Sequence, residues 1–425
     1  MSKGHIVTGL DIGTNTIKAL VAQKKGDNWE VLSSATIPSF GLRRGAVVNV
    51  EETAKNIQLL ISGIERDHTI RINSVFVNIG GSHLYVTPSD GLISVSRTDH
   101  IISQEDIERV LQATRAINIP LNEEILDVFP KEFIIDDQKG IKQPLGLSGV
   151  RLEAKVILLC YFQSYFINLT QAVLNAKLQI DDIIPSSLAA ANAVLTPQQK
   201  EVGVALIDIG SATTSISVFE EGDLIHFAVF PLGSANITND IAIGLKTEVS
   251  IAEDIKKHHG TCVLSKSDKD KKDRSSTRNA SRSDAGGRKK VEVFDESNSL
   301  LFTNKSLVDI IQPRVSEILD LMQKELKKIG RQELLPGGIV LTGGGAKLPK
   351  IKELAKEQLK LNCQIGIPKG IIGLEQDPAL ATVAGLVLEG TDLNDEKKDR
   401  VLGLSLGFMK KFSFKFKRMF RVFIP

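Results

Sequence analysis

An apolar strand that ends in Asp-Ile-Gly occurs twice in this chain, and this repeat constrains the fold more than any other feature. The copies are Ile6 to Gly13 and Val204 to Gly210, and their aspartates lie 197 residues apart. Small hydroxyl residues follow each copy, and then a second strand-like segment, Thr16 to Ala22 or Ser215 to Phe219. A duplicated strand–turn–strand unit predicts two similar α/β domains that face each other across a cleft.

The two turns have the composition of phosphate-binding loops. Gly13 and Gly210 allow the backbone to approach a phosphate closely, with consecutive N–H groups directed at its oxygens. Asp11 and Asp208, on opposite sides of the cleft, are expected to hold a hydrated Mg²⁺, and Lys18 to reach a terminal phosphate. Neighbouring side chains that add donors are Thr14, Asn15, Thr16, Ser211, Thr213 and Thr214.

A third glycine turn, Thr342 to Ala346, separates a predicted strand over 338–341 from a predicted helix over about 350–359. Such a turn suits the close passage of a nucleoside. Each turn alone is explained most simply as an ordinary loop. Three of them in this order, two within a duplicated hairpin, favour a nucleotide site.

Composition limits the class of protein. Apolar residues make up 42% and charged residues 24%, which is typical of folded soluble domains. No apolar run approaches the roughly 18–20 residues that span a bilayer, and the polar start, Met1 to His5, does not resemble a secretory signal. Cys160, Cys262 and Cys363 fit no metal-binding spacing, which predicts reduced thiols in a cytoplasmic protein.

The net charge of +2 is distributed unevenly. Ser265 to Lys290 holds ten basic and four acidic residues, and Ser405 to Pro425 holds six basic residues and no acid. The rest of the chain is therefore acidic and is not expected to bind nucleic acid. Residues 265–288 are nearly devoid of apolar side chains, which predicts a disordered basic insertion.

The last segment, 405–425, has the composition of a helix that lies on a membrane surface. Six of the seventeen phenylalanines fall in its final eighteen residues, and as a helix it shows a broad apolar stripe flanked by lysine and arginine. Docking of this helix on the protein's own core, or in a groove of a partner protein, remains open. The residues expected at an anionic membrane are Phe408, Phe412, Lys415, Phe416, Arg418, Met419, Phe420, Arg421 and Phe423.

Four segments resemble the actin, sugar kinase and heat-shock ATPase superfamily, and within it the FtsA family of bacterial cell-division proteins. They are Gly9 to Lys18, Ile237 to Lys246, Ala252 to Gly260, and Val340 to Pro349. The phosphate turns identify only the superfamily, whereas the middle segments and the basic amphipathic C-terminus select the FtsA family. The resemblance covers nearly the whole chain, and only the loop around 265–290 looks added.

The resemblance implies an α/β, actin-like two-domain ATPase fold with duplicated strand–DxG–strand cores and a C-terminal amphipathic helix. The implied subdomains are 1A (1–83 and 163–200), 1C (84–162), 2A with a return to 1A (201–246 and 331–390), 2B (247–330), a linker (391–404) and the membrane helix (405–425).

The resemblance also implies ATP and Mg²⁺ as cofactors. Glu253 and Lys256 resemble the family's ribose and base contacts, although the residues alone favour an exposed pair on a helix. The implied nucleoside contacts are Gly344, Gly345 and Ala346. The implied phosphate contacts are Gly13, Thr14, Asn15, Lys18, Gly210, Ser211 and Thr213.

The function implied is an adaptor at the cytoplasmic face of the cell membrane at the division septum. Such a protein polymerises, binds the filament protein FtsZ through subdomain 2B, and meets other division proteins. Two departures predict weak ATPase activity at most. The second phosphate turn, Asp208 to Ser215, lacks two glycines and one carboxylate of many relatives, and Ile184 to Ala190 holds no Glu or Gln to orient water.

Two other functions use the same nucleotide site. A small-metabolite kinase would need a carboxylate base in the cleft, for which the sequence offers only Asp11 and Asp208, and would leave the C-terminal helix without a role. A pilus-assembly protein of the PilM type would also bind ATP, but it would need a pilus peptide as its partner.

Overall fold

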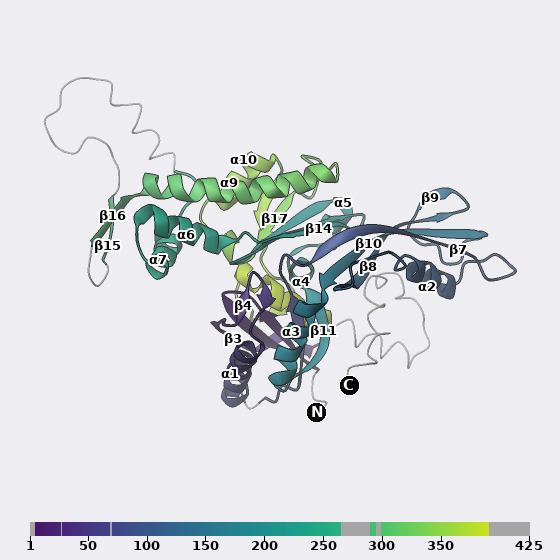
Figure 1. Ribbon diagram of the computed structural model, residues 1–425, viewed down its shortest axis with the longest axis horizontal. Coiled ribbons are helices and arrows are strands. Elements are labelled where there is room, and N and C mark those ends of the chain that lie inside the picture. Colours follow the sequence, from purple (N-terminus) through teal and green to yellow (C-terminus); the bar gives the residue numbers. More distant parts are fainter. Residues whose placement is uncertain (1–4, 27, 69, 265–289, 295–298, 391–425) are drawn as a thin grey trace, which may run out of the picture.

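Two sheets with the same strand order form the centre of the molecule (Figure 1). The computed structural model describes residues 5–26, 28–68, 70–264, 290–294 and 299–390. The first sheet has the order β11-β6-β1-β2-β3-β19, and the second has the order β18-β17-β12-β13-β14. Five strands of the first sheet therefore have counterparts in the second, which confirms the predicted duplication.

The strands of the first sheet are β1 (Ile6–Ile12), β2 (Thr16–Lys25), β3 (Asn28–Pro38), β6 (Ser74–Ile79), β11 (Gln179–Pro185) and β19 (Ile371–Ile372). Those of the second are β12 (Val204–Ile209), β13 (Thr214–Glu220), β14 (Asp223–Phe230), β17 (Ile339–Thr342) and β18 (Cys363–Ile365). β1 and β12 are buried along nearly their whole length because both faces are covered. Their continuous apolar sequences are typical of such central strands.

Helices cover both sheets and connect them. The first helix is α1 (Val50–His68), in which two glutamates in the first turn and Arg66 and His68 in the last turn complement the helix dipole. The remaining helices around the sheets are α3 (Gln163–Asn175), α4 (Ser186–Val194), α5 (Pro197–Val202), α6 (Ser234–Leu245), α7 (Val249–His259), α9 (Asn304–Lys328) and α10 (Ile351–Leu359).

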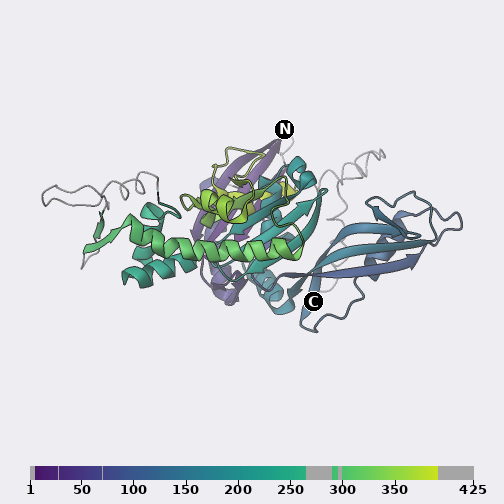
Figure 2. The ribbon, with the colours of Figure 1, turned by 90° about the horizontal axis from the view of Figure 1, so that it is seen from above.

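A separate sheet extends from one side of the molecule (Figure 2). Its order is β7-β10-β8-β9, from β7 (Tyr85–Ser94), β8 (Glu123–Ile135), β9 (Gln138–Ile141) and β10 (Arg151–Phe162). It has its own core, packed under α2 (Gln104–Ala113). The N-terminus of α2 is stabilised by a capping box between Ser103 and Asp106.

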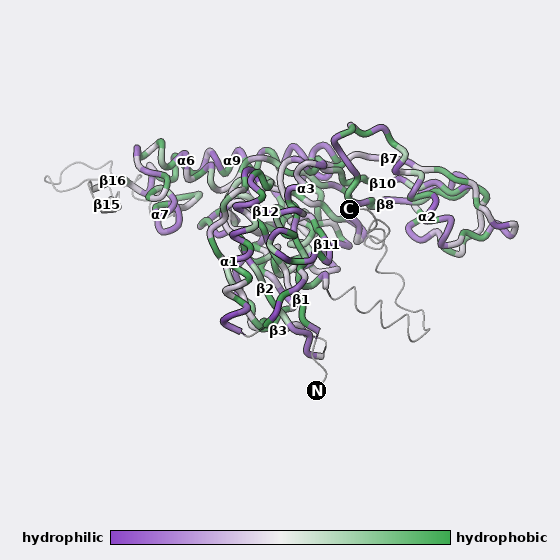
Figure 3. The backbone as a smooth tube through the Cα atoms, turned by 60° about the horizontal axis from the view of Figure 1, so that its bottom comes forward, coloured by the Kyte–Doolittle hydropathy of each residue, from purple (hydrophilic) through white to green (hydrophobic). Residues whose placement is uncertain are grey.

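On the opposite side, α6 lies between α7 and the long helix α9, and a two-stranded hairpin lies at the N-terminal end of α9 (Figure 1). The hairpin is formed by β15 (Lys290–Phe294) and β16 (Ser299–Thr303). Apolar segments, in green, and polar segments, in purple, alternate along the described chain (Figure 3). The predicted insertion (265–288), linker (391–404) and membrane helix (405–425) lie outside the described residues.

The end of the described chain returns to the first sheet. β19 pairs with β3, and the helical residues 381–390 pack against β1 and α4. A Cβ placed on Gly385 would lie 1.7 Å from the carbonyl oxygen of Ala189, so only glycine allows this crossing. In the part of the chain that the structure describes, no helix is both long and apolar enough to cross a bilayer.

Candidate nucleotide site

A cavity of about 900 Å³ opens between the two sheets, where the three predicted turns meet. The predicted site residues that line it are Asp11, Gly13, Thr14, Asn15, Lys18, Asp208, Gly210, Ser211, Thr213, Glu253, Lys256, Gly344 and Gly345. Ala346 is placed differently from the expectation. It is 4% exposed and packs into the core of the second lobe, the domain built around the second sheet, as the first lobe is built around the first sheet. It does so because the turn winds into a short 3₁₀ helix, η1 (Gly344–Lys347).

The two Asp-x-Gly turns are built alike. The N–H of Gly13 donates a hydrogen bond to the carbonyl of Thr16 (3.1 Å), and the N–H of Gly210 donates to the carbonyl of Thr213 (2.8 Å). A Cβ on either glycine would come within 3.0 Å of the same carbonyl oxygen. Glycine is therefore needed for the turn itself as well as for any close approach of a ligand.

The first carboxylate, Asp11, is 6% exposed and held through both of its oxygens. Lys18 lies opposite it in the β1–β2 register and places Nζ 2.8 Å from Oδ2. The Asn78 amide donates to Oδ1 at 2.9 Å. Lys18, expected near a terminal phosphate, is thus paired with Asp11, on the same wall of the cavity.

The second carboxylate, Asp208, has a different environment. Burial, and then the charge of Asp11, raises the pKa of Asp208 to about 6. A carboxylate whose ionisation is opposed by a second carboxylate across the same cavity forms with it a donor set that suits a divalent cation, because the charge of the cation removes the repulsion. Asp11 and Asp208 therefore fit a Mg²⁺ ion, which would screen the charge of bound phosphates.

The third turn approaches Asp208 directly. Gly343 has φ +83°, and a Cβ there would lie 2.3 Å from Asp208 Oδ1. The next residue, Gly344, lines the cavity, and a Cβ added to it would meet no atom within 4 Å. The triple glycine thus combines one position needed for the fold with one that leaves room for a ligand.

Glu253 and Lys256 do not form an exposed pair, which corrects the simplest reading of the residues. Lys256 is 9% exposed, and its Nζ lies 2.6 Å from Glu253 Oε2 and 2.7 Å from Thr238 Oγ1. Although burial opposes ionisation, hydrogen bonds from Lys256 and Thr238 lower the pKa of Glu253. Burial lowers the pKa of Lys256. This pair, with Lys256 buried and Glu253 partly exposed, faces the cavity and offers both a donor and acceptors to a polar ligand.

The sequence reading missed several residues of this cavity. Gly45, in the hairpin of β4 (Leu42–Arg43) and β5 (Ala46–Val47), donates its N–H to Thr14 Oγ1 at 2.9 Å. Asn78 interrupts an otherwise apolar strand, which was the one available signal. Glu375 and Asp377 add carboxylates that the sequence did not suggest, although Asp377 pairs with Lys347 at 2.5 Å.

Sequence comparisons identify relatives over most of the chain. A family model described as "Cell division protein FtsA" matches residues 205–385, and one described as "SHS2 domain inserted in FTSA" matches residues 81–160. The cell division protein FtsA of Pseudomonas aeruginosa is 37% identical over 92% of this chain and 90% of its own. That of Bacillus subtilis is 33% identical over 96% of this chain and 87% of its own.

Solved structures share the fold at low sequence identity. A "PilM-PilN type IV pilus biogenesis complex" has a TM-score of 0.64 and 18% identity, over 90% of this chain and 98% of that one. MreB5 of Spiroplasma citri, solved with ADP, has a TM-score of 0.53 and 12% identity, over 95% of this chain and 100% of that one. The fold is therefore actin-like, and the identity over nearly the whole length places this chain in the FtsA family of cell-division proteins.

Proposed function

We propose that this chain is an ATP-binding, actin-like cell-division protein that polymerises at the inner face of the cytoplasmic membrane. There it tethers FtsZ filaments during septum assembly. The observation that carries the proposal is the cavity in which both Asp-x-Gly turns, the triple-glycine turn and the Glu253–Lys256 pair meet. Family membership supplies the division role, and the neighbour solved with ADP supports a nucleotide in this cavity.

The cavity provides for each part of Mg·ATP. The N–H groups that follow Gly13 and Gly210, with the hydroxyls beside them, are placed to bind phosphate oxygens. Asp11 and Asp208 would hold the ion, whose charge neutralises the phosphates. Glu253 and Lys256 would bind the ribose and base beside Gly344 and Gly345, the roles that the family resemblance implies.

Fast turnover is not expected from this site. The first turn of α4 presents Ser186 to the cavity, at the segment where hydrolysing relatives often carry Glu or Gln. Glu253 is engaged by Lys256 and Asp377 by Lys347, so neither is a free base for a substrate hydroxyl. Glu375 also lines the cavity, so the sequence match to the FtsA relatives, and not a lack of carboxylates, favours an adaptor over a small-metabolite kinase. The PilM alternative rests on fold similarity alone, whereas the FtsA relatives match in sequence.

Co-sedimentation with FtsZ filaments tests the proposal. The full chain with Mg·ATP should pellet with FtsZ polymers, and liposomes of anionic lipid should carry both proteins to the top of a density gradient. A chain that binds ATP but neither FtsZ nor liposomes would contradict the adaptor function and leave the nucleotide site standing. The chain without residues 405–425 is the matched control, since it should still pellet with FtsZ but not float.

A further inference from the structure

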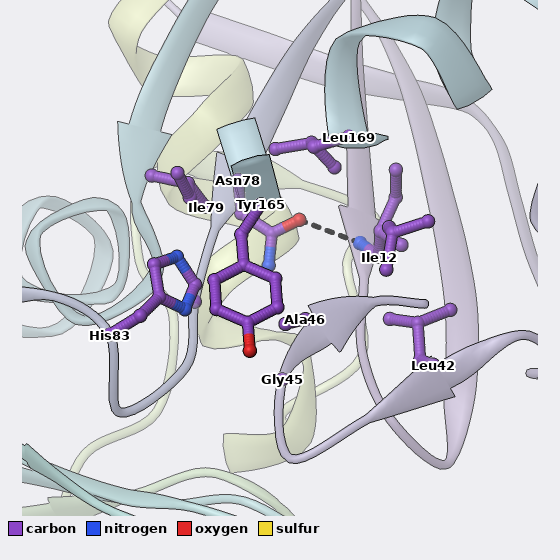
Figure 4. Close-up of a pocket in the computed structure, with 11 residues that line it drawn as sticks. Ile12, Leu42, Gly45, Ala46, Asn78, Ile79, His83, Tyr165 and Leu169 are labelled. Carbon is purple, nitrogen blue, oxygen red and sulfur yellow. Dashed lines mark hydrogen bonds between the residues drawn. The ribbon is translucent and has the colours of Figure 1, made fainter. Parts of the chain in front are cut away.

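Asn78 connects the first carboxylate of the cavity to two other elements. Its side chain is buried at the end of β6 and points toward the backbone nitrogen of Ile12, which donates to Oδ1 at 2.6 Å (Figure 4). Its Nδ2 donates to Asp11 Oδ1 at 2.9 Å and to Ser186 Oγ at 3.0 Å. Because a backbone N–H only donates and a carboxylate only accepts, the amide has a single possible orientation.

The second lobe provides an internal comparison. Its parallel β12–β17 register pairs Asp208 with Thr342. In the first lobe the β1–β6 register pairs Leu10, the residue before Asp11, with Val77, the residue before Asn78. Asn78 and Thr342 therefore occupy equivalent positions beside equivalent aspartates.

The two positions are used differently. The hydroxyl of Thr342 lies 3.2 Å from the carbonyl oxygens of both Gly366 and Pro378 and makes no bond to Asp208. The residue opposite Asp208 in the β12–β13 register is Ser215, where Asp11 has a lysine. Among the described residues, Asp11 is thus hydrogen-bonded by a side-chain amide and an ammonium group, while Asp208 forms neither bond and meets only the charge of Lys18.

We propose that Asn78 is the positioning residue that makes Asp11 the fixed cation-facing carboxylate of this site. Because the buried amide binds Oδ1 and Lys18 binds Oδ2, the carboxylate of Asp11 has one fixed orientation, in which it would help to hold a hydrated divalent cation. The inference rests on the proposed nucleotide function. It adds that the two aspartates are not equivalent, because only Asp11 in the first lobe is fixed by side-chain hydrogen bonds. Partners that orient a metal-binding group typically change metal affinity by about 10- to 100-fold when they are replaced.

The experiment compares ATP binding by the full chain in Mg²⁺ and in EDTA, measured by calorimetry. Asn78→Thr installs the residue of the equivalent position, which suits a strand, and replaces the separate acceptor and donor atoms that contact Ile12 and Asp11 with one hydroxyl on a shorter side chain. It should weaken Mg·ATP binding about tenfold and change ATP binding in EDTA less than about twofold. Asn78→Ser serves the same comparison if Asn78→Thr lowers the melting temperature too far.

Two controls separate positioning from folding. Ser217→Ala removes a buried bond between the lobes, Ser187 Oγ to Ser217 Oγ at 2.8 Å, without touching either carboxylate, so its Mg²⁺ dependence should match the parent. In an Asp11→Asn background, Asn78→Thr should have no further effect. An equal loss in Mg²⁺ and EDTA, or an undiminished loss in that background, would overturn the inference. A parent chain that binds no ATP would instead refute the proposed nucleotide function as well.

Discussion

Single side chains decide how the cavity can be used, and the glycines of the third turn show this most directly. Gly343 is required by its left-handed backbone and by the nearness of Asp208, whereas Gly344 meets nothing that a methyl group would disturb. Two adjacent and identical residues in sequence therefore have different physical roles. Substitution at each should separate the stability of the lobe from the affinity of the site.

Gly343→Ala should lower the free energy of unfolding by about 1–3 kcal/mol, because the new Cβ meets Asp208 Oδ1 in a strained conformation. Gly344→Ala should change stability by less than about 0.5 kcal/mol, yet weaken ATP binding because its methyl group enters the cavity. Urea unfolding and calorimetry on both variants check this. Equal stability of the two variants would contradict the geometry of the turn.

His83 should make stability depend on pH. It packs 4.7 Å from the Tyr165 ring (Figure 4), and burial lowers its pKa from 6.5 to about 4. The unfolded chain therefore binds more protons between those values, so stability is complete above pH 6.5 and falls as the pH drops toward 4. The loss is on the order of 2 kcal/mol by pH 5.

The comparison uses His83→Phe, which keeps a ring against Tyr165 but cannot titrate. Urea unfolding of both chains at pH 7.5 and pH 5 isolates the histidine, because all other groups are shared. The parent should lose more stability than the variant on acidification. A parallel loss in the two chains would show that His83 titrates normally.

Near α4, the last described helix of the chain packs against the first strand. The helical residues 381–390 cross α4 at Gly385, where the backbones touch, and also cover Gly9 of β1. Both crossings lie in the core cluster that also includes Val204 and Leu206 of the second sheet. The contact therefore ties the first lobe to the second and to the residues that precede the C-terminal segment.

Gly385→Ala should destabilise the protein by about 3 kcal/mol or more, since a Cβ 1.7 Å from a backbone oxygen forces the helices apart. Gly63→Ala is the matched control within α1, where a Cβ meets nothing within 4 Å. It should raise stability by about 0.5–1 kcal/mol through helix propensity. Thermal unfolding of the two variants measures both effects. A mild effect of Gly385→Ala would refute the close contact between residues 381–390 and α4.

At the scale of the whole chain, the proposed function predicts that residues 405–425, outside the described structure, bind the membrane. Burial of Phe412, Phe416, Phe420 and Phe423 at an interface would contribute several kcal/mol in total, at roughly 25 cal/mol per Å². Phe416→Glu with Phe420→Glu should release the chain from anionic liposomes. The six basic residues add an attraction that salt screens, so replacing the cations by Gln should matter mostly at low salt.

The segment fused to an unrelated soluble protein should float with the same vesicles. A fusion that stays in solution, or a double-Glu chain that still floats, would remove the membrane role. Docking on the protein's own core or on a partner would then account for the apolar stripe.

The features of this protein that depend on local pattern could be predicted from its sequence. Apolar runs predicted β1 and β12, their turns followed from Asp-x-Gly, and one repeat implied two matching sheets, because strand and turn preferences act over a few residues. Which distant groups contact each other became clear from the folded structure alone. Asn78 reaches Asp11 across 67 residues, and Ala346 turns into the core. Such contacts depend on how whole elements pack, which no local pattern encodes.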